Sequence, residues 1–218
     1  MSEAAITHNE LQRSAPSHRT SPLAFIVAGW FVLVLSLSAN EVFVTERSRV
    51  PIALLVASTA PVIVFLGSYW LSQAVRKAVL AVNLDPIISV QAWRVGGFSF
   101  IVLYSYGILP GFFAWPAGLG DMAIGATAPL MVALLRKRRF AGSKAFVTWN
   151  ILGILDLVAA VGLGALGSQV VENAGGVVST TPMAYLPLVL VPALFVPAFV
   201  ILHLVALLKA RMTSLDQT

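Results

Sequence analysis

Long apolar runs are the feature that most limits how this chain can fold. A helix needs about 20 mostly apolar residues to cross roughly 30 Å of hydrocarbon. Open strand edges find no hydrogen-bond partner in lipid, and the runs lack the alternation of barrel strands. The sequence therefore predicts an all-α integral membrane protein, a bundle of six transmembrane helices. The predicted spans are about Pro22–Asn40, Val50–Gln73, Pro86–Leu109, Gly118–Leu135, Phe146–Gly167 and Ala184–Leu208.

The composition also favours lipid as the surrounding solvent. Hydrophobic residues make up 58% of the chain and charged residues 11%, whereas charge is about a quarter of an ordinary soluble domain. The lipid bilayer is therefore the expected main partner, and a homo-oligomer is compatible with this composition. The chain contains no cysteine. This excludes disulfides, thiolate metal sites and thiol nucleophiles.

The basic residues are unevenly distributed between the loops. If the N-terminus is cytoplasmic, the outward loops hold only Arg47 and Arg49, and Arg94 lies within a span. The positive-inside rule then predicts N-in and C-in topology in the inner (plasma) membrane. The net charge of +5 follows from topology, so no nucleic-acid partner is expected. The inward segments hold Arg13, Arg19, Arg76, Lys77, Arg136, Lys137, Arg138, Arg139, Lys144, Lys209 and Arg211.

The chain divides into a membrane domain with two tails. Residues 1–21 have no apolar periodicity and are expected to be a disordered cytoplasmic tail. Residues 22–209 form the six-helix domain, and residues 210–218 a short cytoplasmic tail. The first span, which ends in "SLSAN", can alternatively be a cleaved signal peptide. Its long polar lead and the length of its apolar run favour an uncleaved anchor.

Several polar residues fall at similar depth in three different spans. At about 1.5 Å per residue, Gln91 and Arg94 lie about 7 and 12 Å from the cytoplasmic side. Asn150 and Asp156 lie about 6 and 15 Å deep, and His203 about 9 Å from the inner end of its span. The inner half of the bilayer is thus predicted to contain one polar layer.

Arg94 needs a partner, because an intramembrane charge costs about 2.5–3.5 kcal/mol on insertion scales. Asp156 is the opposite charge at comparable depth, so the favoured interpretation is a buried ion pair. Alternatively, Arg94 extends to the headgroups or faces a ligand, and Asp156 is a neutral, hydrogen-bonded carboxyl. The remaining guanidinium donors would go to Gln91, Asn150, Tyr69, Gln73 or His203.

The segment "GILPGFFAWPAGLGDMAIG", residues 107–125, interrupts the apolar pattern at the outer face. Its prolines and glycines predict that the third helix ends near Leu109 and that the fourth starts around Gly120–Asp121. Asp121 is then an N-cap near the outer surface. The alternative is a re-entrant hairpin in which Asp121 attracts a cation or a proton. In the sixth span Pro187, Pro192 and Pro197 predict a bent helix.

The familiar catalytic motifs are missing from the sequence. There is no HExxH zinc motif, no GxSxG nucleophile elbow and no phosphate-binding P-loop. Asp121 and Asp156 are predicted at different depths, which argues against a paired-aspartate protease. An enzyme is therefore not the favoured interpretation.

Three hypotheses remain. In the first, Arg94, Asp156, His203, Gln91 and Asn150, with Asp121, bind or transport a small polar solute, an ion or a proton, without a cofactor. In the second, the protein is a b-type haem or redox protein with His203 as axial metal ligand. In the third, it is a non-catalytic membrane scaffold or partner subunit, and its polar layer only specifies helix packing.

Overall fold

The computed structural model describes residues 22–45, 49–137, 140–173 and 178–215, which form helices and turns without any β-strand. The expected tail at residues 1–21 lies outside them. The described residues fall into two compact units, the first ending at Leu33 and the second beginning at Val34. Helix α2 (Pro22–Ala39) is apolar along its length, and its described part is shorter than a full span.

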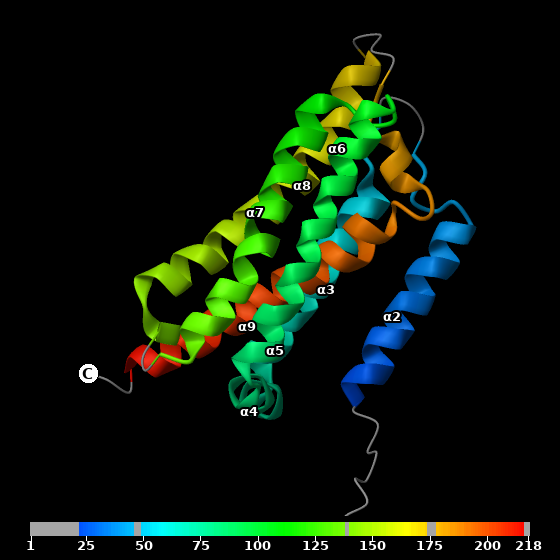
Figure 1. Cartoon of the computed structure of the whole chain (residues 1–218). Coiled ribbons are helices and arrows are strands. Elements are labelled where there is room, and N and C mark those ends of the chain that lie inside the picture. The colour runs from blue at the N-terminus through cyan, green and yellow to red at the C-terminus, as the bar shows by residue number, and fades with distance from the viewer. Residues whose placement is uncertain (1–21, 46–48, 138–139, 174–177, 216–218) are drawn as a thin grey trace, which may run out of the picture. The chain divides into compact units, whose positions relative to one another are not determined.

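Within the described residues, five helical stretches are long and apolar enough to cross a membrane. The protein is therefore all-α and membrane-embedded, as predicted (Figure 1). The second and last of these stretches are composite, because a 3₁₀ segment interrupts the second and the last begins with a π-helical turn. The elements are α3 (Ile52–Leu71); α5 (Leu84–Val90), η1 (Gln91–Gly97) and α6 (Phe98–Ser105); α7 (Gly111–Leu135); α8 (Lys144–Asn173); and η4 (Val191–Phe195) with α9 (Val196–Leu215).

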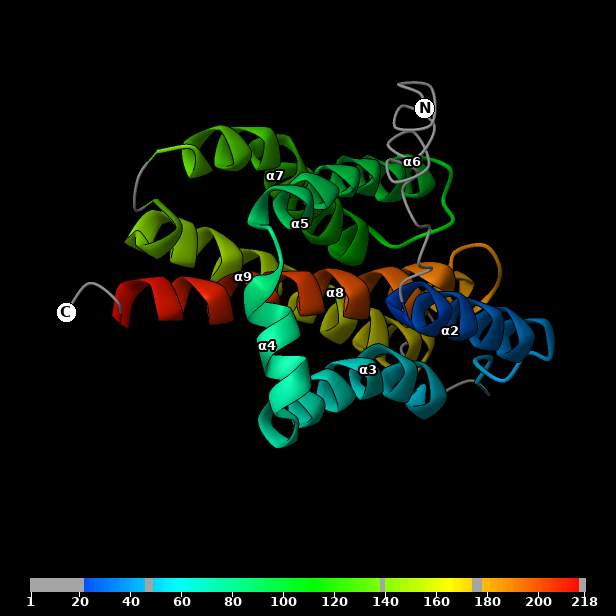
Figure 2. The ribbon, with the colours of Figure 1, turned by 90° about the horizontal axis from the view of Figure 1, so that it is seen from below.

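The helices from α3 onward have two distinct ends. One end carries α4 (Gln73–Ala81), η2 (Phe140–Gly142) and the C-terminal part of α9; Figure 2 shows α4 running across the direction of its neighbours. The other carries residues 43–45 and 49–51, the turn at 106–110 and η3 (Thr181–Ala184). We call the first the basic end, after Arg76, Lys77, Arg136, Lys137, Lys144, Lys209 and Arg211, and the second the opposite end.

The helix boundaries differ from the predicted ones at the break after the third span. Helix α6 ends at Ser105, because Gly107 turns the chain with a φ of 69°. Pro110 is extended and directly precedes α7, which begins at Gly111. The turn is thus only a few residues long, and the predicted start of the fourth helix around Gly120–Asp121 is wrong.

The last span also begins later than predicted. Residues after η3 form turns, and the helix becomes continuous only from Val191. The π turn η4 carries Pro192 near its start, and Pro197 follows in α9. Each of these prolines, like Pro187 before them, lacks the backbone N–H that a regular helix needs. The regular helix accordingly starts after Pro187 rather than at Ala184.

Two of the apolar clusters that the buried residues form are separated by polar residues. The cluster toward the basic end includes Ile88, Phe146 and Ala206, and the cluster toward the opposite end includes Phe100 and Phe113. Along each helix the polar residues fall between members of these clusters, so they share one level. We call this level the polar layer; it consists of Gln91, Arg94, Asp121, Asn150, Asp156 and His203.

Candidate functional site

Arg94 occupies the 3₁₀ segment η1, in the middle of the membrane-length stretch Leu84–Ser105. A 3₁₀ helix has three residues per turn, so positions three apart lie on one face. Gln91, Arg94 and Gly97 have this spacing and are all buried. The segment packs against α7. Local tightening of the helix therefore directs Arg94 into the bundle, where it is only 2% exposed.

The guanidinium of Arg94 is held by groups from three other helices. Its Nε donates to Asp121 Oδ1 of α7 at 2.7 Å, and its Nη2 donates to Asp156 Oδ2 of α8. Its Nη1 lies 3.0 Å from His203 Nε2 of α9 and 3.3 Å from the Gly153 carbonyl oxygen. These contacts use four of the five guanidinium donors. Arg94 thus does not extend to the headgroups.

The two aspartates differ in how well the sequence placed them. The predicted pairing of Arg94 with Asp156 is confirmed. The interpretation of Asp121 as an N-cap is wrong, since α7 starts at Gly111 and Asp121 lies well inside it. The earlier start carries Asp121 deeper by about 1.5 Å per residue. Both carboxylates therefore reach one guanidinium, although they were expected at different depths.

His203 is fixed between two polar partners. Its Nδ1 lies 2.9 Å from Asn150 Oδ1, and Asn150 Nδ2 donates to the Phe146 carbonyl oxygen at 2.9 Å. Arginine can only donate, so His203 Nε2 must accept from Arg94. The imidazole is then the neutral form with its proton on Nδ1. The expected contact of His203 with the guanidinium is present, and Asn150 contributes by orienting the ring.

This geometry does not fit His203 as a haem ligand. An axial ligand needs a free ring nitrogen, and both nitrogens of His203 are engaged, one by Asn150 and one by Arg94. Ligation through Nε2 would require the guanidinium to move away from its carboxylates. Within the described part of the chain, no group of three or more His, Cys, Asp or Glu residues could hold a metal ion.

Gln91 lies one 3₁₀ turn from Arg94 but takes a different partner. Its Nε2 donates to the Phe199 carbonyl oxygen at 3.4 Å, so it does not serve the guanidinium as the sequence suggested. Its Oε1 is buried and accepts no hydrogen bond from the residues that the structure describes. Such an unused acceptor is uncommon in a native interior.

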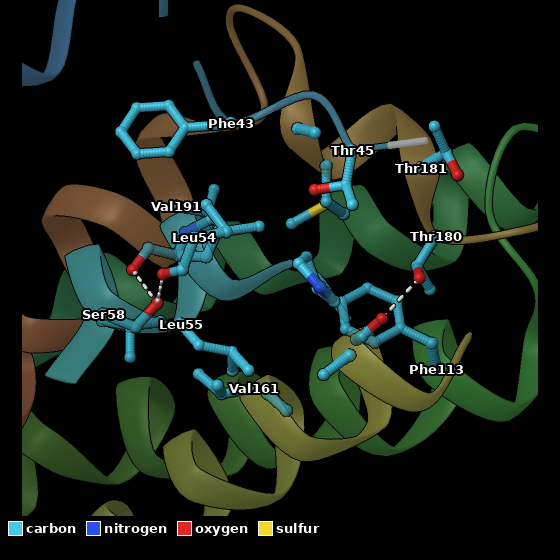
Figure 3. Close-up of a pocket in the computed structure, with 18 of the residues that line it drawn as sticks. Phe43, Thr45, Leu54, Leu55, Ser58, Phe113, Val161, Thr180, Thr181 and Val191 are labelled. Atoms are coloured by element: carbon cyan, nitrogen blue, oxygen red, sulfur yellow. Dashed lines mark hydrogen bonds between the residues drawn. The ribbon is translucent and has the colours of Figure 1, made fainter. Parts of the chain in front are cut away.

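A cavity reaches the polar layer from the opposite end. Its volume is about 70 Å³, and Asp121 forms part of its lining. Figure 3 shows Leu54, Ser58 and Val161 among the side chains around it. No pattern in the sequence indicated this cavity. On α8 the lining residues share one face and start directly after Asp156: they are Leu157, Ala160, Val161, Gly164 and Ala165.

One wall of the cavity is the π turn η4. There the N–H of Val196 donates to the Val191 carbonyl oxygen, five residues back. The next donor would be Pro197, which has no N–H, so the Pro192 carbonyl oxygen lacks a helical partner. The Ser58 hydroxyl of α3 lies 2.8 Å from this oxygen and 2.9 Å from the Leu54 carbonyl oxygen of its own helix, so its single proton is shared between the two acceptors. A neighbouring helix thus satisfies the group that the proline leaves free.

Comparison with known families now identifies the part of the chain that holds this site. A family described as "Domain of unknown function (DUF8737)" matches residues 51–211. The chain belongs to the DUF8737 family. The matched segment begins just before α3, extends into α9 and contains every residue of the polar layer. No curated protein and no solved structure matches the chain.

Glycines make room for the polar layer inside the DUF8737 segment. A Cβ at Gly97 would overlap Asp121, one at Gly120 would overlap Asp156, and one at Gly153 would overlap the His203 ring. A signal was present in the spacing. Gly97 follows Arg94 by three residues, and Gly120 directly precedes Asp121. Small residues let helices approach closely in membranes.

Proposed function

We propose that this protein is a multi-pass protein of the inner (plasma) membrane whose polar layer binds a proton or a small cation and passes it across the membrane. Intramembrane ionisable residues by default mark such pathways. The charge balance of the layer is the observation that carries this proposal.

The polar layer contains more acidic than basic groups. Asp121 and Asp156 both contact the single guanidinium of Arg94, while His203 is neutral. With both carboxylates ionised, the layer has one uncompensated negative charge. A buried unpaired charge costs several kcal/mol. One proton or one monovalent cation would restore neutrality, whereas an anion or an uncharged solute would not.

Exposure indicates which groups an entering ion would meet. The side chain of Arg94 is 0% exposed, whereas those of Asp121 and Asp156 are each 16% exposed. The carboxylates, and not the guanidinium, are therefore accessible. Asp121 also lines the cavity, which supports entry of a cation from that side.

The proposed topology gives this route a direction. We propose that α2 completes six spans and that the N- and C-termini are cytoplasmic. The basic end then faces the cytoplasm by the positive-inside rule. The cavity opens toward the opposite end, so it would take its ion from outside the cell.

Flux measurements in proteoliposomes test the proposal. The full chain is reconstituted with a dye inside that reports H⁺, Na⁺ or K⁺, and the gradient of the matching ion is applied in each case. We expect the native protein to dissipate at least one gradient, and Asp121→Asn and Asp156→Asn each to slow this by about tenfold, equivalent to about 1.4 kcal/mol. Asp85→Asn is the matched control, since Asp85 lies at the start of α5 outside the layer. Vesicles with native protein that stay as tight as empty ones would overturn the proposal.

A scaffold remains the second candidate, because the Arg94 contacts join η1, α7, α8 and α9. Such a network can serve packing alone. The same experiment separates the two functions. A scaffold would show no flux in the native protein, and the aspartate variants would lose stability only.

A further inference from the structure

The cavity combines apolar walls with two charged side chains, Asp121 at the polar layer and Arg49, which already has an interaction partner of its own. Leu55, Val161 and Val196 are among its wall residues, and Asp121 also lines it. The hydroxyls of Ser58 and Thr180 also face this region but already donate to backbone carbonyl oxygens, of Pro192 and Gly164 respectively. The walls therefore offer contact to an apolar body, and Asp121 offers a negative charge.

Apolar walls are a poor surface for a hydrated metal ion. A cation that enters such a space loses water without gaining new oxygen ligands, which is unfavourable. Apolar cavities hold water weakly and accept apolar ligands instead. A volume of about 70 Å³ has room for about five water molecules, or a molecule of about five non-hydrogen atoms.

We infer that the cavity binds a small primary alkylammonium ion, with its alkyl chain against the apolar walls and its ammonium group on Asp121. This inference rests on the proposed cation function and names the class of cation. Butylammonium, with four carbons and one nitrogen, has the size that the cavity admits.

The geometry at Asp121 provides the charge complementarity. Its contact with Arg94 uses Oδ1, which leaves Oδ2 as an acceptor for one of the three ammonium donors. The ligand would supply the positive charge that the polar layer lacks. An alcohol of the same shape offers the apolar contact without the charge, and a carboxylate placed at Asp121 would be repelled.

The absence of native cysteine allows a direct binding test. Val161→Cys places a single thiol in the cavity wall, and Val158→Cys places one on the lipid-facing side of the same helix, where Val158 is 58% exposed. The full chain in nanodiscs is labelled with N-ethylmaleimide, with and without butylammonium. We expect labelling of Val161→Cys to slow about tenfold at a ligand concentration about ten times its dissociation constant. Labelling of Val158→Cys should not change.

Two comparisons test the assigned chemistry. Butanol at the same concentration should protect much less, and Asp121→Asn combined with Val161→Cys should lose the protection. Equal protection by butanol, or full protection without the carboxylate, would overturn the inference. The absence of protection at any concentration at which butylammonium is soluble would also overturn the inference. If Val161→Cys does not fold, Ala160→Cys is used for the same measurement.

The outcomes also separate this inference from the proposed function. Proton, Na⁺ or K⁺ flux without protection by butylammonium would leave the proposed function standing and remove the alkylammonium assignment. Protection without flux would establish the binding site and remove transport.

Discussion

The polar layer and the cavity are neighbours that share Asp121, yet they are built on opposite principles. In the polar layer, Arg94 and His203 find their partners within the protein, and glycines hold the helices close. The cavity has apolar walls and unfilled space. The polar layer is suited to select a ligand by its charge, and the cavity to select it by its shape. Asp121 contacts Arg94 through Oδ1 and also lines the cavity, so it is the residue that joins the two regions.

Removing the guanidinium should break the polar layer and have the largest effect. Arg94→Gln leaves two partly buried carboxylates without their cation, and we expect a loss of about 3–5 kcal/mol in the free energy of unfolding. The measurement is denaturant-induced unfolding in detergent micelles. Asp156→Asn alone should also destabilise the protein.

The double variant Arg94→Gln/Asp156→Asn sharpens this result. Because the two residues contact each other, the losses of the single variants should sum to more than the loss of the double variant. Strictly additive losses would contradict the ion pair as the organising contact of the layer.

Added volume beside the layer should have a smaller effect. Gly97→Ala places a methyl group against Asp121, and we expect a loss of about 1–3 kcal/mol from overpacking. Gly96→Ala is the neighbouring control, because its new Cβ would meet nothing within 4 Å. Thermal unfolding of the two variants should differ clearly. Equal behaviour would show that the layer is loosely packed, more like the cavity.

A change in the cavity wall should have the smallest effect. Ser58→Ala removes the donor to the Pro192 carbonyl oxygen, and an unsatisfied buried acceptor costs about 1–3 kcal/mol at most. The adjacent Thr59 donates only within its own helix, to the Leu55 carbonyl oxygen, so Thr59→Ala is the control. A stability loss from Thr59→Ala as large as that from Ser58→Ala would refute the bridging role.

The sequence predicted the depth of a residue in the membrane wherever the start of its helix was also predicted correctly. Arg94, Asp156 and His203 were assigned to one layer from the helical rise alone, and the structure brings them into contact. Asp121 was misplaced because its depth depends on the start of α7. The short turn at Gly107 and Pro110 sets that start, and the sequence pattern suggested a longer break.

By itself, the sequence determined an all-helical, lipid-embedded protein with polar residues at a common depth, because hydrophobic length and helical rise are local properties. Only the tertiary structure decided which faces of the helices meet. A helix that is apolar all round has no amphipathic face to mark its inner side, so its rotation is set by packing against distant neighbours. That rotation placed both aspartates on one guanidinium, turned Gln91 to another partner and left the cavity beside them.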